Sequence, residues 1–397
     1  MTTPSWLSAA EAARRLGVKR ETLYAYVSRG LVRSTPKGGR TRARLYARED
    51  IERARRRAED RRDPAAIATH ALSHGSPVLE SSITLIEGGR LFYRGQDAVE
   101  LSRSRSVTEV ASLIWRGMFD AFPSASRRRR ADSTSARSLP LGARAQSLLA
   151  AAAARDSLAF DLRADAVVAA GSRILDLMVS AADGVRDTGI PIEERLAHGW
   201  QVPRRAAGLL RAAIILSADH ELNVSAFTAR CVASAGGSPY GAVIAGLAAL
   251  EGIKHGGLTT RVESMLGAMR GERSGHDALA ARLREGAPLD GFGHPLYPDG
   301  DPRATEVLAR LEERYPRSPE LRFARDVAAA AWSALEQHPT IDFALATLTR
   351  VAGLPPRSGL ALFAIGRSIG WIGHALEQYA SGTLIRPRAK YVGPVAG

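Results

Sequence analysis

Five short segments of this 397-residue sequence place polar side chains in otherwise apolar text or beside glycines. They fall at 218–230, 252–257, 291–303, 340–343 and 363–374. Together they contain carboxylates and imidazoles, which transfer protons in catalysis, and arginines, which bind carboxylates through two parallel hydrogen bonds. Residues of these types can perform acid–base chemistry on an anionic substrate, provided that the fold brings them together.

Each segment taken alone also has a purely structural interpretation. His220 would share a helical face with Asn223 and Phe227, and a lone histidine on an apolar face is more often a hydrogen-bonded core residue. His255 precedes two glycines and could merely end a helix. Asp342 could be an ordinary N-cap. The case for a site therefore depends on the five segments as a set.

Helices are expected to position these residues. After a hairpin over 82–95 with a Gly-Gly turn, the sequence consists of Ala-, Leu- and Arg-rich stretches broken by Gly and Pro. It shows no repeated β-then-α rhythm, phosphate loop or dinucleotide-binding glycine pattern. Arg367 and His374 are seven residues apart, two helical turns, so we expect an inward polar stripe on one helix. The segment 122–139, with four consecutive arginines, is expected to be an exposed loop.

The order and spacing of the five segments resemble the citrate synthase family, from about residue 80 to residue 395. The hairpin ending in Tyr93-Arg94-Gly95 also matches the N-terminal signature of that family. The resemblance implies a mainly α fold, with a large all-α body made of large and small helical subdomains. It further implies an enzyme that condenses acetyl-CoA or propionyl-CoA with oxaloacetate, giving citrate or methylcitrate and free coenzyme A.

The resemblance also assigns roles to individual residues. A thioester α-carbon is a very weak acid, so a carboxylate must remove its proton while a donor stabilises the enolate oxygen. By family position Asp342 is the base, and His255 donates to the thioester carbonyl. His294 polarises the 2-oxo carbonyl and protonates the new alkoxide. The loop 289–294 corresponds to the coenzyme A contact region, where glycines permit close backbone approach; these glycines are Gly291 and Gly293.

The acceptor is a dianion, which calls for fixed cationic groups. By family position Arg303 and Arg367 bind its carboxylates together with His220. Arg386 reaches in from the neighbouring subunit, which makes a homodimer part of the active site; without the family, Arg386 is an ordinary residue of a charged tail. The resemblance implies no metal and no permanently bound cofactor, because the coenzyme A thioester is a co-substrate.

One position departs from the family pattern. The family usually follows His-Gly-Gly with Ala-Asn, whereas Leu258-Thr259 follow here. We expect this change to reshape the pocket near His255.

The basic excess of the chain is concentrated at its N-terminus. The whole sequence has a net charge of +14. Residues 1–62 hold 17 Lys and Arg against 7 Asp and Glu, a net charge of +10, which leaves +4 for the remainder. This asymmetry indicates a module that faces a polyanion, attached to a nearly neutral body.

The local pattern of this N-terminal region is that of a helix-turn-helix. A first helix is expected over 7–16, with Ser8 as its N-cap and Glu11 at capping-box spacing. Gly17 ends it, and a second helix follows as far as Gly30.

A basic wing is expected next. A strand beginning at Leu31-Val32, a glycine-containing tip over 35–42 and a returning strand over 44–46 lead into a third helix from Glu49-Asp50 to Arg57. The whole arrangement resembles the winged-helix module of MerR-like and excisionase-like regulators.

We expect this module to bind DNA, with the start of the second helix in a major groove and the wing on phosphates. The helix residues are Lys19, Arg20, Thr22 and Tyr24, and the wing residues are Arg40, Arg42 and Arg44. The alternatives are a solvated basic surface or a wing that contacts protein. An alternative function follows from the module: a transcriptional regulator whose citrate-synthase-like body only senses an acyl-CoA or a 2-oxo acid.

The predicted organisation is a winged helix-turn-helix module over 1–60, a hinge over 61–76 and a catalytic body over 77–397. The single cysteine, Cys231, cannot form an internal disulfide, which fits a reducing compartment. No signal peptide is recognisable. The longest apolar runs, such as 241–250, are shorter than the roughly 20 residues that span a bilayer. We therefore expect a cytoplasmic protein without a membrane partner.

Overall fold

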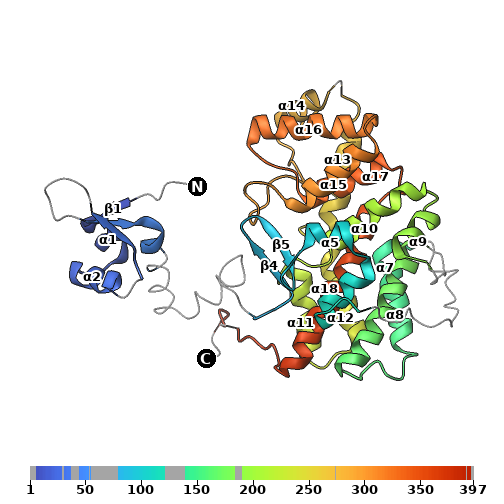
Figure 1. Cartoon of the computed structure of the whole chain (residues 1–397), viewed down its shortest axis with the longest axis horizontal. Coiled ribbons are helices and arrows are strands. Elements are labelled where there is room, and N and C mark those ends of the chain that lie inside the picture. The colour runs from blue at the N-terminus through green and yellow to red at the C-terminus, as the bar shows by residue number, and fades with distance from the viewer. Residues whose placement is uncertain are drawn as a thin grey trace. The chain divides into compact units, whose positions relative to one another are not determined.

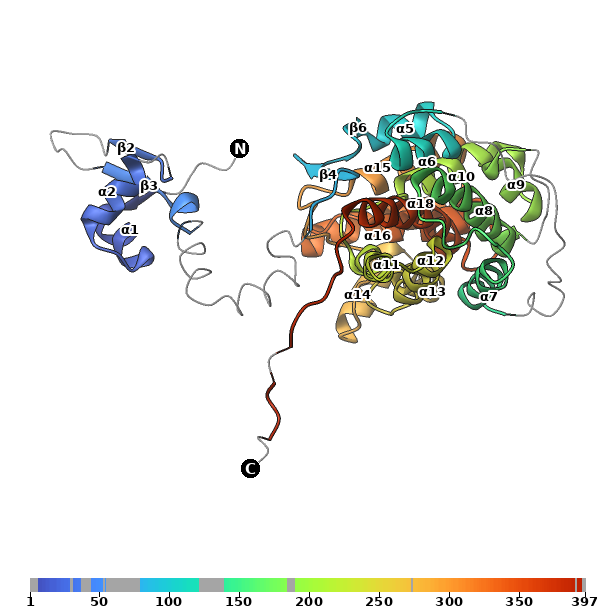
Figure 2. The same ribbon diagram turned by 90° about the horizontal axis from the view of Figure 1, so that it is seen from below.

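The computed structural model describes residues 6–28, 31–36, 44–52, 54, 79–120, 139–183, 190–272, 274–389 and 391–394. The chain divides into two compact units, Met1–Glu80 and Ser81–Gly397. Helices dominate the second unit, and the strands described form two small three-stranded sheets (Figures 1 and 2). The expected mainly α fold class is confirmed.

The N-terminal unit is a helix-turn-helix with a small antiparallel sheet of strand order β1-β3-β2. Its elements are β1 (Trp6–Ser8), α1 (Ala9–Leu16), α2 (Arg20–Ser28), β2 (Ser34–Pro36) and β3 (Arg44–Ala47). The predicted capping box is present, because Ser8 Oγ accepts from the Glu11 amide while the Glu11 carboxylate accepts from the Ser8 amide. Gly17 ends α1 in the left-handed conformation, with φ of 64°.

Three details of this unit differ from the prediction. The strand expected from Leu31-Val32 begins only at Ser34, and Val32 packs in the core of the unit. β1 was not predicted: Leu7 and Ser8, which were expected in the first helix, pair with β3, so that α1 begins at Ala9. Helical structure begins at Arg48, one residue before the expected start of the third helix. The tip of the wing, the hinge over 61–76 and the loop over 122–138 lie outside the described residues.

The second unit opens with the predicted hairpin. β4 (Thr84–Glu87) and β5 (Arg90–Tyr93) turn at Gly88-Gly89, and β6 (Gln96–Asp97) completes the sheet. The first helices after it are α5 (Ala98–Ser104), α6 (Val107–Arg116), α7 (Leu141–Ala153), α8 (Ala164–Asp183), α9 (Ile192–Gly199), α10 (Ala207–Leu216), α11 (Val224–Ser234) and α12 (Pro239–Leu250). The remaining helices are α13 (Gly257–Met269), α14 (Gly275–Arg284), α15 (Pro302–Arg314), α16 (Pro319–Leu335), α17 (Ile341–Val351) and α18 (Ser358–Ser381).

Two hydrophobic cores lie within this unit. The larger core joins the hairpin to α6, α8, α10, α12 and α18. A smaller core forms between α13, α14, α16 and α17, which lie together at one end of the body in Figure 1. These two cores correspond to the large and small helical parts that the sequence predicted.

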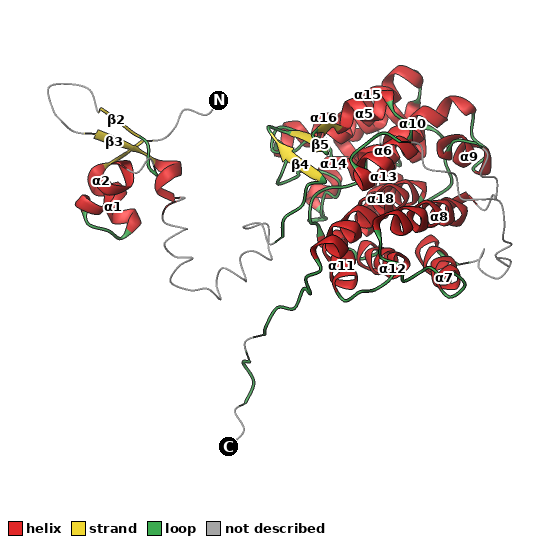
Figure 3. Cartoon of the chain, turned by 60° about the horizontal axis from the view of Figure 1, so that its bottom comes forward, coloured by secondary structure: helices red, strands yellow, loops and turns green. Residues whose placement is uncertain are grey.

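α18 runs through the larger core, surrounded by other helices (Figure 3). Its glycines permit close packing, since a Cβ at Gly366 would lie 2.4 Å from the Ile214 carbonyl oxygen and one at Gly370 would lie 2.4 Å from that of Ala218. By length and composition α18 could cross a membrane, which the sequence reading overlooked; yet 89% of its apolar window is buried inside the protein, as in a core helix.

Candidate active site

Asp342 is the second residue of α17 and is partly buried. The N-cap of that helix is Thr340, so Asp342 is not the ordinary cap that its sequence also allowed. One carboxylate oxygen of Asp342 accepts a hydrogen bond from the Thr259 hydroxyl. Removal from water raises the pKa of Asp342 to about 6, against the opposing influence of Thr259 and of two nearby arginines. A carboxyl group with this pKa can act as a base at neutral pH.

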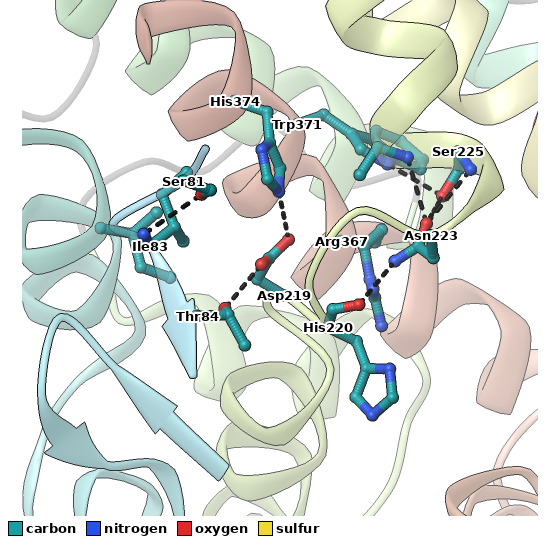
Figure 4. A network of polar contacts seen from close by, with 12 residues as sticks. Ser81, Ile83, Thr84, Asp219, His220, Asn223, Ser225, Arg367, Trp371 and His374 are labelled. Atoms are coloured by element: carbon teal, nitrogen blue, oxygen red, sulfur yellow. Dashed lines mark hydrogen bonds and ion pairs between the residues drawn. The ribbon is translucent and has the colours of Figure 1, made fainter. Parts of the chain in front are cut away.

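His255 lies in the turn between α12 and α13 and does not end a helix. Its Nε2 is 2.8 Å from Ser225 Oγ, which also accepts a hydrogen bond of 3.1 Å from Trp371 Nε1 (Figure 4). Burial, with a smaller contribution from Arg367, lowers the pKa of His255 to about 4. At neutral pH the imidazole is therefore uncharged, and it can act as a neutral hydrogen-bond donor.

His220 lies outside any helix, which corrects the predicted helical face shared with Asn223 and Phe227. Asn223 is the N-cap of α11, and its Oδ1 accepts from the amides of Ser225 and Ala226. The helix therefore begins only after His220. His220 lies in the turn between α10 and α11, and Figure 4 shows it beside Arg367.

The rings of Tyr297 and His294 lie next to His220. Its Nε2 is 3.1 Å from Tyr297 Oη, and its ring centroid is 5.2 Å from that of His294. His294 Nδ1 accepts from the Leu296 amide at 3.2 Å, so a neutral His294 carries its proton on Nε2. Tyr297 is almost fully buried, and sequence reasoning had not given it a role.

Arg303 is held by a buried carboxylate. Its Nε and Nη2 donate to the two oxygens of Asp301 at 2.9 and 2.8 Å, and both residues are buried. Asp301 also caps α15 and accepts from the Ile341 amide at 3.0 Å. It thus ties the arginine to the first turn of α17, where Asp342 lies. The sequence Asp301-Pro302-Arg303 indicated the start of α15, because Asp before Pro is common at the start of a helix.

Arg367 is 1% exposed and forms no ion pair with a carboxylate of the described residues. Its Nε donates to the Ser217 carbonyl at 3.0 Å, while its Nη1 has no hydrogen-bond partner there. Its positive charge lowers the pKa values of His220, His255 and Asp342. Its guanidinium carbon lies 4.8 Å from the centre of the Phe363 ring, which is 6.3 Å from that of His255. A buried donor without an acceptor is costly, and a bound anion would satisfy it.

The predicted polar stripe of α18 is confirmed, since Arg367 and His374 are both buried. His374 Nε2 is 3.2 Å from Asp219 Oδ1, and Thr84 donates to the other oxygen of Asp219 at 2.6 Å (Figure 4). This buried network joins strand β4 to α18 behind the turn that carries His220. Sequence reasoning did not identify Asp219 or Thr84.

Gly291 and Gly293 both have positive φ, 86° and 70°, which favours glycine over other residues. The Gly291 carbonyl accepts from the Thr340 amide at 2.9 Å, and the Gly293 amide donates to the His338 carbonyl at 2.9 Å. This loop is therefore fastened to the segment that leads into Asp342. Its contact with coenzyme A stays a prediction.

Arg386 does not join the other candidate residues in this chain. It is exposed, in the extended tail that leaves the body after α18 (Figure 2). The start of this tail is anchored where Gln378 Nε2 donates to the Thr383 carbonyl at 2.7 Å.

The DNA-facing candidates of the second helix lie where the sequence placed them. Lys19 directly precedes α2, and Arg20, Thr22 and Tyr24 lie in its first half; all four are exposed. Arg44 is also exposed and donates to the Ser34 side chain at 2.9 Å. Arg40 and Arg42 lie outside the described residues.

No group of three or more His, Cys, Asp or Glu side chains suited to a metal ion occurs among the described residues. What the site offers is a partly buried carboxylate, neutral imidazoles and two buried guanidinium groups.

Comparison with known proteins places this arrangement in a family. Residues 72–388 match the model of the citrate synthase C-terminal domain, and residues 6–58 match that of a helix-turn-helix domain. Citrate synthase of Haloferax volcanii is 30% identical over 80% of this chain and 94% of its own length. The 2-methylcitrate synthase of Shewanella oneidensis is 27% identical over 78% and 90% of the two chains.

A solved structure shares the fold. It is the ternary complex of carboxymethyl coenzyme A and oxaloacetate with the citrate synthase of Thermoplasma acidophilum. Its TM-score is 0.70 at 23% identity, over 81% of this chain and 95% of that one.

The unpartnered guanidinium of Arg367 leads to a testable prediction. A small dicarboxylate such as malonate should raise the melting temperature of the protein, since a ligand at one hundred times its Kd stabilises by about 2.7 kcal/mol. Arg367→Met should abolish this shift, because it removes the buried donor that lacks an acceptor. The melting temperature of the variant without malonate shows whether it is folded. Arg322→Met, at an exposed position, should keep the full shift. A malonate shift that persists in Arg367→Met would contradict the assignment.

Proposed function

Because this chain belongs to the citrate synthase family, and is a citrate synthase-like enzyme, we propose that it condenses acetyl-CoA or propionyl-CoA with oxaloacetate. The products are citrate or methylcitrate and free coenzyme A. The observation that carries the proposal is the position of Arg367, whose charge acts on Asp342, His255 and His220 together. A base, a neutral donor and an anion-binding group thus share one site.

In the proposed mechanism Asp342 takes a proton from the α-carbon of the thioester. His255, which is neutral, donates a hydrogen bond to the thioester oxygen where negative charge develops. The α-carbon then attacks the 2-oxo carbon of oxaloacetate, and His294 gives its proton to the new alkoxide. Water then attacks the carbonyl carbon of the resulting thioester: one of its protons returns to His294, and its oxygen stays in the new carboxyl group. The departing thiolate of coenzyme A takes the proton that Asp342 holds.

Oxaloacetate would be held by the buried residues of the site. Arg367 offers its free Nη1 to one carboxylate, and Arg303 is oriented by Asp301. The pKa of His220 lies well below its usual value, first because of burial and then because of the charges of these arginines. His220 is therefore a neutral donor or acceptor that does not titrate near neutral pH.

The exposed tail supports a contribution from a second subunit. Arg386 lies away from the other candidate residues of its own chain, so it would complete the site of a partner in a homodimer.

A second function is favoured by the N-terminal unit. Its helix-turn-helix, with four exposed candidate residues on and before α2, supports DNA binding. The protein would then either combine the two activities or act as a regulator whose body senses an acyl-CoA or a 2-oxo acid.

Coenzyme A release from mixtures of oxaloacetate with acyl-CoAs of increasing chain length tests the enzymatic proposal and reveals the preferred acyl group. Asp342→Asn should lower kcat at least about a hundredfold, because it removes the base, while oxaloacetate binding persists. Asp326→Asn, at an exposed site, should behave as wild type.

The kcat/KM of the wild type should fall tenfold per pH unit below about pH 6, since Asp342 is then protonated. Ligand binding without any coenzyme A release would favour the sensor.

The shared site can be tested by mixing inactive variants. Asp342→Asn and Arg386→Ala, each inactive alone, should regain about a quarter of wild-type activity when refolded together, because half the dimers then contain one complete site of two. Asp342→Asn mixed with His294→Ala should stay inactive, since both residues serve the same chain's site. Equal activity in the two mixtures would exclude the proposed role of Arg386.

Binding of a random-sequence duplex should weaken steeply with salt, as expected for phosphate contacts. The double variant Arg42→Ala/Arg44→Ala should reduce the slope of log K against log salt by about two, because the wing arginines are the expected phosphate contacts and each lost contact removes about 0.9. Arg317→Ala/Arg322→Ala removes two exposed charges from the body and should leave the slope unchanged. Binding that is indifferent to salt would argue against this use of the module.

A further inference from the structure

We propose that Thr259 is a positioning residue for the reaction: its hydroxyl holds one oxygen of the Asp342 carboxylate and leaves the other oxygen free for the substrate. This inference rests on the proposed function of Asp342. It concerns the position at which the sequence departs from the family's usual Ala-Asn, four residues beyond His255.

The hydrogen bond between Thr259 and Asp342 joins two helices. Thr259 is 0% exposed and lies in the first turn of α13, and it donates across to the first turn of α17. A threonine hydroxyl has a single proton, so the bond commits that proton to Asp342 Oδ1. The second oxygen of Asp342 accepts no hydrogen bond from the described residues. One oxygen is thus fixed and the other is available as the base.

The methyl group of Thr259 is fixed as well. A Cβ placed on Gly359, in the first turn of α18, would lie 3.1 Å from Thr259 Cγ2, so the glycine leaves room for that methyl. With its methyl against α18 and its hydroxyl on Asp342, the threonine side chain is held in one rotamer. Such support from packing is what keeps a reactive group in a productive orientation.

The bond also acts on the charge of the base. Burial raises the pKa of Asp342 to about 6, and the Thr259 hydroxyl opposes this rise by stabilising the carboxylate. Three charged groups face Asp342: Arg303 and Arg367 lower its pKa, and Asp301 raises it. Unlike these three groups, Thr259 is uncharged, so a substitution can remove its hydroxyl without changing the net charge of the site.

The test compares coenzyme A release across pH 5 to 9 in the wild type, Thr259→Val and Thr259→Ser. Valine matches threonine in shape but lacks the hydroxyl. Thr259→Val should lower kcat at least about tenfold, leave the KM for oxaloacetate within about twofold, and move the acid midpoint upward by about one unit. Thr259→Ser, which keeps the hydroxyl, should retain the wild-type midpoint.

Thr347→Val is the matched control, because Thr347 lies on α17, is equally buried and has a hydroxyl without a hydrogen-bond partner. It should leave both kcat and the midpoint unchanged. Melting temperatures of all variants show whether each is folded. A Thr259→Val variant with wild-type kcat and midpoint, or a Thr347→Val variant that shifts equally, would overturn the proposal.

A second measurement does not depend on turnover. Carbon-13 NMR of labelled aspartate carboxyls, with Asp342 assigned through Asp342→Asn, gives the titration midpoint of this group directly. A higher midpoint in Thr259→Val than in the wild type and Thr347→Val supports the role of Thr259, whether or not coenzyme A is released. If no coenzyme A is released, only the enzymatic proposal fails. Equal midpoints in the three proteins would overturn the inference whatever the activity.

Discussion

The buried guanidinium of Arg367 is the constraint around which the second unit is organised. An arginine remains charged at any physiological pH, and this one is almost completely removed from water without a carboxylate at ion-pair distance among the described residues. Its charge favours the uncharged form of two imidazoles and the ionised form of Asp342. Burying this charge is unfavourable, and the packing of the surrounding helical core must compensate for it.

The position of this charge depends on how α18 packs. Gly366 directly precedes the arginine and Gly370 follows it by three residues, and each lies against a carbonyl of the 214–218 segment with no room for a side chain. The Gly370 amide donates to the Ala218 carbonyl at 3.0 Å, and Arg367 itself donates to Ser217. The same contacts hold the turn that carries His220. Two glycines thereby set the distance between the buried guanidinium of Arg367 and the neighbouring His220 imidazole.

The sequence predicted local features well, because their causes are local. The Ser8 capping box and the end of α1 at Gly17 follow from backbone preferences that a few residues determine. His220 was misplaced on a helix because its apolar periodicity outweighed a better signal, the strong N-cap preference of Asn223. Contacts between distant segments could not be predicted from spacing. Thr84 and Asp219 are 135 residues apart, and only the packed core brings them together.

The two candidate functions place different demands on Asp342. A body that only sensed a dianion would bind it more tightly without a carboxylate beside the arginines, since like charges repel at short range. Asp342 nevertheless lies within the influence of both Arg303 and Arg367, partly exposed, with one oxygen held and a pKa of about 6. This arrangement weakens anion binding but is well suited to removing a proton near neutral pH. The electrostatics of the site therefore support the enzyme over the sensor, and any regulatory role of the N-terminal unit would be added to catalysis.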